Sequence, residues 1–158
     1  MNEEQMLFAT EDQMAHKETA VVEVQTEKYL IFVSDSLRYG LNAEQVKEII
    51  TNYSITYLPR VPHYIRGIVN LRGQIIPIID IRLRLGKPTQ EDNCFIVVEM
   101  DNGQIGILVD GVEKMVDIPK DSILPMPTQN EQKLVSGMCS LPDGGTMLIL
   151  DCDALLHG

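Results

Sequence analysis

The chain has 158 residues, 44% of them apolar, with three cysteines and a formal net charge of −10 at pH 7. This length suits one compact domain or two small lobes, and a chain of this size needs neither a metal nor a disulfide to form a stable core. An acidic chain is a poor candidate for nucleic-acid binding, which requires a broad basic face. No apolar run approaches the roughly 18 residues of a membrane-spanning helix, so no direct membrane insertion is expected.

The charge is unevenly distributed. Residues 1–27 contain seven acidic side chains and one lysine, and we expect a flexible acidic tail there, since so polar a segment cannot bury enough apolar surface to offset the entropy of ordering. Residues 60–87 contain five arginines and one lysine against the single acid Asp80. These cations are either scattered on the surface or form a basic patch for a protein partner.

The first half of the chain predicts strands at 29–33, 37–41 and 53–58, the last ended by prolines. Between the second and third, Asn42 resembles a helix cap, and Val46, Ile49 and Ile50 have the spacing of one helical face, so a helix of about two turns is predicted. Residues 65–71 and 75–81 are apolar runs joined by Arg72-Gly73-Gln74, which predicts a tight hairpin.

The polar connector at 87–93 suggests a seam between two lobes near residue 90. Beyond it, Asp101-Asn102-Gly103 and the segment 142–145 have the composition of turns. Asp151 is suited to cap a short closing helix at 153–156. The strands predicted in this half are 94–100, 104–109, 112–118, 133–141 and 147–150.

These elements indicate an all-β fold, with about ten short strands and two short helices. The chain lacks the long crossover helices of βαβ units, which argues against a parallel α/β sheet. Short strands separated by turns are typical of small barrels or a sandwich, and two five-stranded lobes fit the polar seam.

The sequence carries no recognisable catalytic or metal-binding motif. His16, His63 and His157 are far apart, and no nucleotide-binding glycine loop or serine-hydrolase motif occurs. Helix capping accounts for Asp151 and Asp153 more simply than a carboxylate cluster with Asp80 does. We therefore expect no catalytic residues, no metal and no cofactor, and a function in surface recognition rather than in catalysis.

The segment from Leu58 to Arg82, LPRVPHYIRGIVNLRGQIIPIIDIR, strongly resembles the CheW domain family. Weaker matches are Tyr39-Gly40-Leu41 with residues 46–50, residues 106–112, Ser136-Gly137 and residues 147–151, so that the resemblance extends over 28–157. It implies two SH3-like β-barrels side by side and a non-enzymatic adaptor in chemotaxis signal transduction. The implied partners are the regulatory domain of a CheA-type histidine kinase and the cytoplasmic tip of methyl-accepting chemoreceptors. The implied location is the cytoplasm, at the inner face of the membrane within receptor arrays, which agrees with three widely spaced cysteines that suit a reducing compartment.

The resemblance also assigns individual residues. A receptor helix would need a groove with exposed aliphatic side chains, for which Val46, Ile49 and Val112 are candidates, although plain core packing is the stronger explanation of these three. Gly67 and Gly73 could serve turns alone, Thr56 could be an ordinary strand residue, and Arg72 and Glu48 could be solvated charges. The positions that match kinase-binding residues of the family are Glu48, Thr56, Arg66, Gly67, Arg72, Gly73 and Gly137.

Two alternatives stay open at this point. One is a similar adaptor that serves a twitching or surface-sensing pathway. The other is a small-ligand or nucleotide-binding β-barrel, which would need a concave pocket with converging polar groups.

Overall fold

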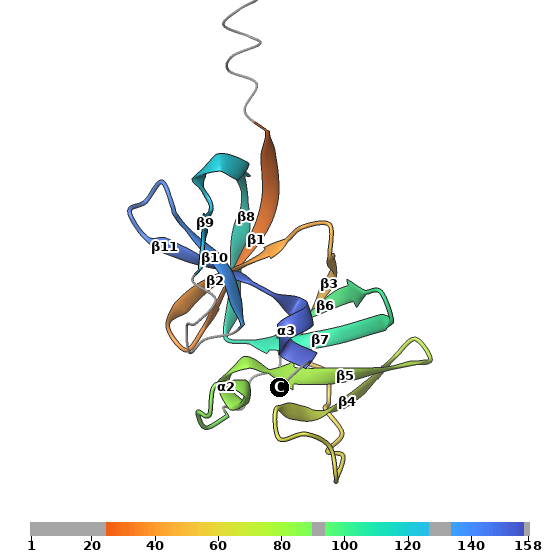
Figure 1. The fold of residues 1–158 in the computed structure, drawn as a ribbon. Coiled ribbons are helices and arrows are strands. Elements are labelled where there is room, and N and C mark those ends of the chain that lie inside the picture. Colours follow the sequence, from red (N-terminus) through yellow and green to blue (C-terminus); the bar gives the residue numbers. More distant parts are fainter. Residues whose placement is uncertain (1–24, 90–93, 127–133, 157–158) are drawn as a thin grey trace, which may run out of the picture.

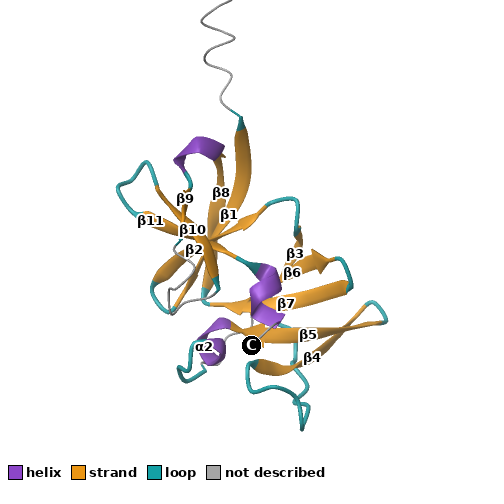
Figure 2. Cartoon of the chain, viewed as in Figure 1, coloured by secondary structure: helices purple, strands orange, loops and turns teal. Residues whose placement is uncertain are grey.

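The computed structural model describes residues 25–89, 94–126 and 134–156, and strands make up most of these residues (Figure 1, Figure 2). The predicted all-β fold with two short helices is confirmed. The helices are α2 (Ile81–Arg84) and α3 (Cys152–Leu156), and Lys120–Ser122 forms a single 3₁₀ turn. The predicted tail at 1–24 and the connector at 90–93 lie outside the described residues, and residues 26 and 27 already belong to the first strand.

The strands form two mixed sheets. One sheet has the order β8 (Gly111–Pro119), β1 (Thr26–Ser34), β2 (Leu37–Asn42), β11 (Thr146–Leu150), β10 (Val135–Ser140) and β9 (Leu124–Pro125). The other has the order β3 (Val46–Ile50), β6 (Cys94–Met100), β7 (Gly103–Val109), β5 (Gln74–Asp80) and β4 (Ile65–Leu71). Neighbouring strands are antiparallel except for the pairs β2–β11 and β5–β7, which are parallel.

The division between the lobes differs from the predicted one. Strands β3, β4 and β5 precede residue 90 and share a sheet with β6 and β7, which follow it, so the seam predicted near residue 90 is wrong. The six-stranded sheet combines the N-terminal hairpin with the last four strands. It exceeds the expected five strands by the two-residue strand β9.

The two sheets have the same sequence of pairings. Reading β3-β6-β7-β5-β4 against β8-β1-β2-β11-β10, every pair has the same orientation, and the parallel pair occupies the same place. Beyond β4, Thr56 bridges to Ile68, as β9 pairs with β10 in the other sheet. A short helix follows β5 and another follows β11, each with an aspartate, Asp80 or Asp151, that accepts from backbone N–H groups of its first turn. The chain therefore folds as two lobes that share the same strand order and the same strand orientations.

Three apolar clusters fill this arrangement. One lies inside the five-stranded lobe around Phe95 and Ile78, and a second lies inside the six-stranded lobe around Ile31 and Met147. The third contains side chains from both sheets and from α3, including Phe32 and Ile107, so it joins the lobes. Burial of this shared apolar surface holds the lobes together.

The predicted helix after Asn42 is wrong, because residues 46–50 form strand β3. A bulge at Lys47 explains the helix-like spacing of the apolar residues. Val46 lies opposite Val98, and Ile49 lies opposite Ile96. Val98 and Ile96 both belong to the cluster between the lobes. One extra residue in a strand places side chains three apart on the same side, which reproduces the spacing of a helix. Asn42 accepts from the Glu44 N–H group at 3.0 Å in a turn rather than capping a helix.

Two further elements differ from the prediction. The segment 53–58 pairs with the sheet only at Thr56, since Asn52 with its φ of 62° turns the chain away after β3. Helix α2 was not predicted at all, because the apolar residues at 75–81 read as one strand, whereas Ile81 already belongs to the helix that Asp80 caps.

Candidate docking surfaces

The β4–β5 hairpin ends in the two-residue turn Arg72-Gly73. Both residues have positive φ, 51° and 85°, as the turn type that matches the twist of a hairpin requires. The Asn70 side chain accepts from the Gly73 N–H group at 3.1 Å. Arg72 therefore projects from the end of the sheet, with 73% of its side chain exposed.

Arg72 is held by Glu48 on strand β3. Its two terminal nitrogens lie 2.6 and 3.1 Å from the two carboxylate oxygens of Glu48. The guanidinium lowers the pKa of Glu48, and the carboxylate raises that of Arg72, in each case chiefly through the hydrogen bond. Because this pairing uses two of the five N–H donors of arginine, the others remain available on an exposed, oriented group.

The ion pair also shows how the sheet is shaped. Strands β3 and β4 are the two edges of the five-stranded sheet, yet Glu48 on β3 reaches the turn that ends β4. The chain after β3 then passes along the other edge, where Thr56 and Ile68 exchange backbone hydrogen bonds of 2.8 and 2.9 Å. The sheet thus curls until its edges approach each other, and three predicted kinase-binding residues, Glu48, Thr56 and Arg72, lie along these edges.

Gly67 lies beneath the Thr56 segment and has a packing role. A Cβ atom at Gly67 would be 2.3 Å from the Thr56 carbonyl oxygen and 2.7 Å from the Ile55 Cγ2. At Gly73, in contrast, an added Cβ atom would have no atom within 4 Å, so its positive φ is what favours glycine there.

Arg66 points inward. It lies 3.7 Å from the carboxylate of Asp80, which is 2% exposed, and it donates a hydrogen bond to Thr89. Thr89 also donates to Asp80. Arg66 therefore ties strand β4 to the end of β5 and to the start of the connector, and it does not project toward solvent as Arg72 does.

Gly137 belongs to the other lobe. It is buried in β10, opposite Ile149 of β11 and Pro125 of β9, and a Cβ atom there would be 3.0 Å from the Leu124 carbonyl oxygen. Its surroundings match those of Gly67, since both follow a bulge and both lie under the short segment that covers the sheet edge. The structure does not place it with the residues around Arg72.

The basic stretch 60–87 does not form a free cationic patch. Arg82 pairs with Asp110 and, at 3.0 Å, with Asp35, and Lys87 also pairs with Asp35. The Arg84 guanidinium lies 5.3 Å from the centre of the Tyr64 ring. Because these cations serve intramolecular contacts, the hypothesis of a basic patch for a partner is wrong for most of the stretch.

The boundary between the lobes carries apolar side chains on both edge strands. Val46 of β3 and Val112 of β8 are half-buried against the shared cluster, and they occupy equivalent positions before a bulge. Ile49 and Met115, three residues further on, are also equivalent, with exposed fractions of 42% and 48%. Sequence reasoning named Val46, Ile49 and Val112 as candidates but did not name Met115, whose equivalence to Ile49 is apparent only from the matching bulge at Glu113.

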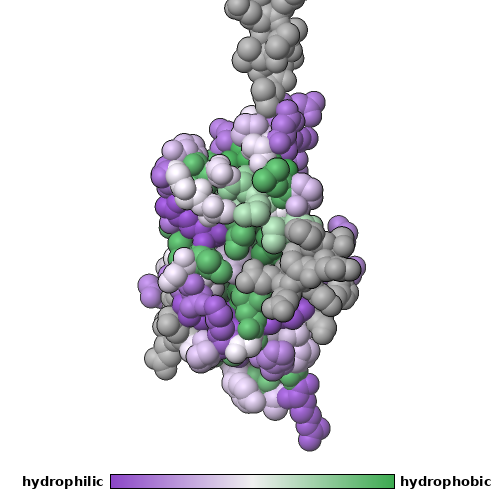
Figure 3. Space-filling model, turned by 60° about the vertical axis from the view of Figure 1, so that its left-hand side comes forward, coloured by the Kyte–Doolittle hydropathy of each residue, from purple (hydrophilic) through white to green (hydrophobic). Residues whose placement is uncertain are grey.

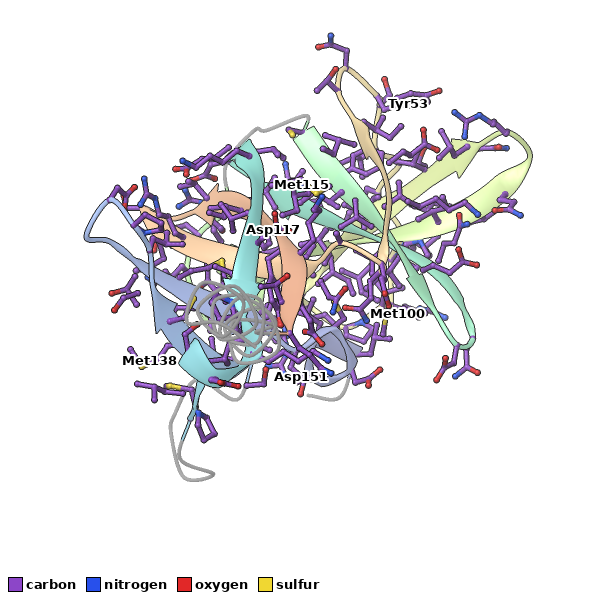
Figure 4. All side chains as sticks on the ribbon, turned by 90° about the horizontal axis from the view of Figure 1, so that it is seen from above. Tyr53, Met100, Met115, Asp117, Met138 and Asp151 are labelled. Carbon is purple, nitrogen blue, oxygen red and sulfur yellow. The ribbon has the colours of Figure 1, made fainter. Side chains whose placement is uncertain are left out.

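Further exposed apolar residues were not predicted. Tyr53 and Tyr57 lie in the segment after β3, with Tyr57 76% exposed, and Figure 4 shows Tyr53 at the outer loop, with Met115 further in beside β8. In the other lobe, exposed Leu124 of β9 stands opposite half-buried Met138 of β10, which stands opposite half-buried Leu148 of β11. Figure 3 shows apolar surface among hydrophilic residues on the side of the molecule that includes these strands.

The titratable groups serve packing and capping. Burial raises the pKa of the Cys152 thiol to about 12, which leaves it protonated and a poor nucleophile. The side chain of Asp151 accepts from the N–H groups of Asp153 and Ala154, as an N-cap does. Among residues 25–89, 94–126 and 134–156, no three His, Cys, Asp or Glu side chains gather to hold a metal ion, and no helix could cross a bilayer.

Comparisons with known proteins agree on one domain family. The CheW-like domain family matches residues 28–158. The chemotaxis protein CheW of Klebsiella aerogenes is 33% identical over 137 residues, which cover 82% of this chain and 81% of that protein. The CheW of Bacillus subtilis is 28% identical over 135 residues, which cover 82% and 86%. The crystal structure of the scaffolding protein TtCheW from Thermoanaerobacter tengcongensis superposes with a TM-score of 0.77 at 31% identity, covering 85% of this chain and 94% of that one.

Proposed function

Because this chain belongs to the CheW family of chemotaxis scaffold proteins, we propose that it couples transmembrane chemoreceptors to a CheA-type histidine kinase through protein–protein contacts, without catalysing a reaction. The observation that carries the proposal is the pair of equivalent lobes with two separate kinds of exposed surface. One is the charged hairpin end around Arg72, and the other is the apolar boundary between the lobes.

The kinase contact is assigned to the hairpin end. Arg72 and Glu48 form an exposed, oriented ion pair at a rigid turn, and a paired arginine with free donors suits carboxylates or carbonyl groups of a partner. Thr56 lies on the neighbouring edge. Gly67 contributes indirectly because it lets the Thr56 segment pack on β4, and Arg66 anchors the base of the same hairpin. Gly137 packs under β9 in the other lobe and belongs to neither surface.

The receptor contact is assigned to the boundary between β3 and β8. Val46, Ile49 and Val112, with Met115, give two equivalent rows of apolar side chains, one from each lobe. A helix from the cytoplasmic tip of a receptor would place its apolar face against such rows, as in other helix-in-groove complexes. An adaptor with these two contacts would act in the cytoplasm at the inner face of the membrane, within receptor arrays.

Co-sedimentation with receptor-containing membranes and a CheA-type kinase tests the proposal. The wild-type chain should bring kinase into the pellet. Arg72→Ala should reduce kinase recovery while the chain itself still sediments with receptor, and Met115→Asp should reduce recovery of the chain itself. Lys114→Ala removes an exposed cation next to Met115 and is the matched control that should change neither. Wild-type recovery of kinase with the Arg72 variant would refute the assignment of the hairpin end.

A further inference from the structure

The N-terminal ends of strands β5 and β7, with Glu99 of β6, line an open cleft beside the hairpin end that carries Arg72. The cleft has a volume of about 410 Å³, within the usual range for ligand sites of about 300–1,000 Å³. Its residues belong to the tips of the β4–β5 and β6–β7 hairpins, which project from the lobe in Figure 1. Its lining consists of Gln74, Ile75, Ile76, Glu99, Gly103 and Gln104.

Pro77 explains why the two strands separate there. The parallel ladder between β5 and β7 runs from Ile78 opposite Gly106 to Asp80 opposite Leu108. One step earlier, a parallel ladder would have the Gln104 carbonyl accept from the N–H group of residue 77. Proline has no N–H group, so the ladder cannot continue and the Gln104 carbonyl has no donor on β5.

Backbone groups of both strands therefore face the cleft. In the β4–β5 hairpin, Leu71 and Gln74 flank the turn as the hydrogen-bonded pair, and successive residues alternate in direction. The mutual bonds of Ile68 with Thr56, on the far side of β4, agree with this alternation. By the same rule Ile75 of β5 and Gln104 of β7 direct their N–H and C=O groups away from their hairpin partners and toward each other's strand.

The equivalent place in the other lobe is closed. There Leu148 stands where Pro77 does, and the ladder between β11 and β2 includes Leu148 opposite Tyr39. Arg38, the equivalent of Gln104, covers the opening and binds Glu113 at 3.2 Å and Asp143 at 2.8 Å. A Cβ atom at Gly145 would be 2.6 Å from the Arg38 guanidinium, so Arg38 packs closely against the turn between β10 and β11.

We propose that this cleft binds a short extended peptide segment of a partner protein, whose backbone adds as a strand through hydrogen bonds to the Gln104 carbonyl and to the Ile75 N–H group. The chemistry of the lining supports an uncharged segment. Glu99 is paired with Lys47 at 3.5 Å, and the other polar side chains are the amides of Gln74 and Gln104. Backbone hydrogen bonds would supply affinity, and exposed Ile75 would favour alternate aliphatic side chains.

Titration of the ¹⁵N-labelled chain with the neutral peptide acetyl-Thr-Val-Thr-Val-Thr-amide, followed by amide chemical shifts, tests this. Saturable shifts should be confined to 74–76, 99 and 103–104. The same peptide with N-methylated valines should bind at least tenfold more weakly, because it lacks the N–H donors along one edge of the strand and carries methyl groups there. Equal binding of the methylated peptide, which would mean recognition of side chains or of a small ligand, would overturn the proposal, as would shifts that do not saturate.

Two variants close the cleft in ways that the other lobe already uses. Pro77→Leu restores the missing N–H group, and Gln104→Arg supplies a side chain equivalent to Arg38. Each should reduce peptide binding at least tenfold. Ser140→Arg, an exposed position in the other lobe, is the control and should bind as the wild type does. If Pro77→Leu does not fold, Gln104→Arg decides alone, and unchanged binding by this variant would refute the site.

Discussion

Gly67→Ala separates the packing role of this glycine from a role in partner binding. The added methyl group would lie 2.3 Å from the Thr56 carbonyl oxygen, far inside van der Waals contact, and the obstacle is backbone rather than a flexible side chain. The segment 55–56 must move away from β4. This movement breaks the two backbone hydrogen bonds between Thr56 and Ile68, worth about 1 kcal/mol each. With overpacking strain of about 1 kcal/mol, we expect a loss of about 3 kcal/mol in the free energy of unfolding.

Gly73→Ala and Gly137→Ala provide a graded comparison. At Gly73 the only cost is positive φ, about 1 kcal/mol, partly offset because alanine restricts the unfolded chain. At Gly137 the contacts are 3.0 Å, so the neighbours must shift by only a few tenths of an ångström, and we expect a loss between the other two. Urea unfolding followed by circular dichroism measures all three. If Gly67→Ala is no less stable than Gly73→Ala, the packing argument fails, and the glycine must be explained by partner contact.

Two other stability predictions follow from the ion pairs. Arg82→Met should lower the urea midpoint, because it removes the cation that Asp110 and Asp35 share; an unchanged urea midpoint would show that this pairing contributes nothing to stability. The pKa values of Glu48 and Asp143 are lowered, the first chiefly by Arg72 and the second chiefly by the Gly145 N–H group. Stability from these groups is present above their ordinary pKa of about 4 and is lost as the pH falls through the lowered values. The double variant Glu48→Gln with Asp143→Asn should therefore show a flatter dependence of the urea midpoint on pH between about 5 and 3, and an unchanged slope would contradict this.

Sequence reasoning succeeded where local patterns agreed with the tertiary structure. The hairpin at Arg72-Gly73 is fixed by its own turn chemistry, and the closing helix by the Asp151 cap. It failed at β3, where a bulge gave a strand the spacing of a helix. A bulge depends on the partner strand β6, almost fifty residues away, so no local window contains the information.

The basic stretch shows a second limit. Charge counting within residues 60–87 was correct, but the acids that neutralise Arg82 and Lys87 come from other parts of the chain. Asp35 lies in the turn between β1 and β2, and Asp110 lies between β7 and β8. A local excess of charge therefore says little about the surface until the topology is known.

The equivalence of the two lobes gives the chain a way to carry different contacts on one repeated framework. Val46 and Val112 keep the same role on both sides of the boundary, as do Ile49 and Met115, so the apolar boundary surface is nearly symmetric. The outer ends of the lobes differ instead. One has Arg38 bound between two acids, and the other has Pro77, an interrupted ladder and an open cleft. If a partner helix docks on this boundary as proposed, the symmetry would let it bind in either direction, and we expect the ends of the lobes, where the residues differ, to set its orientation.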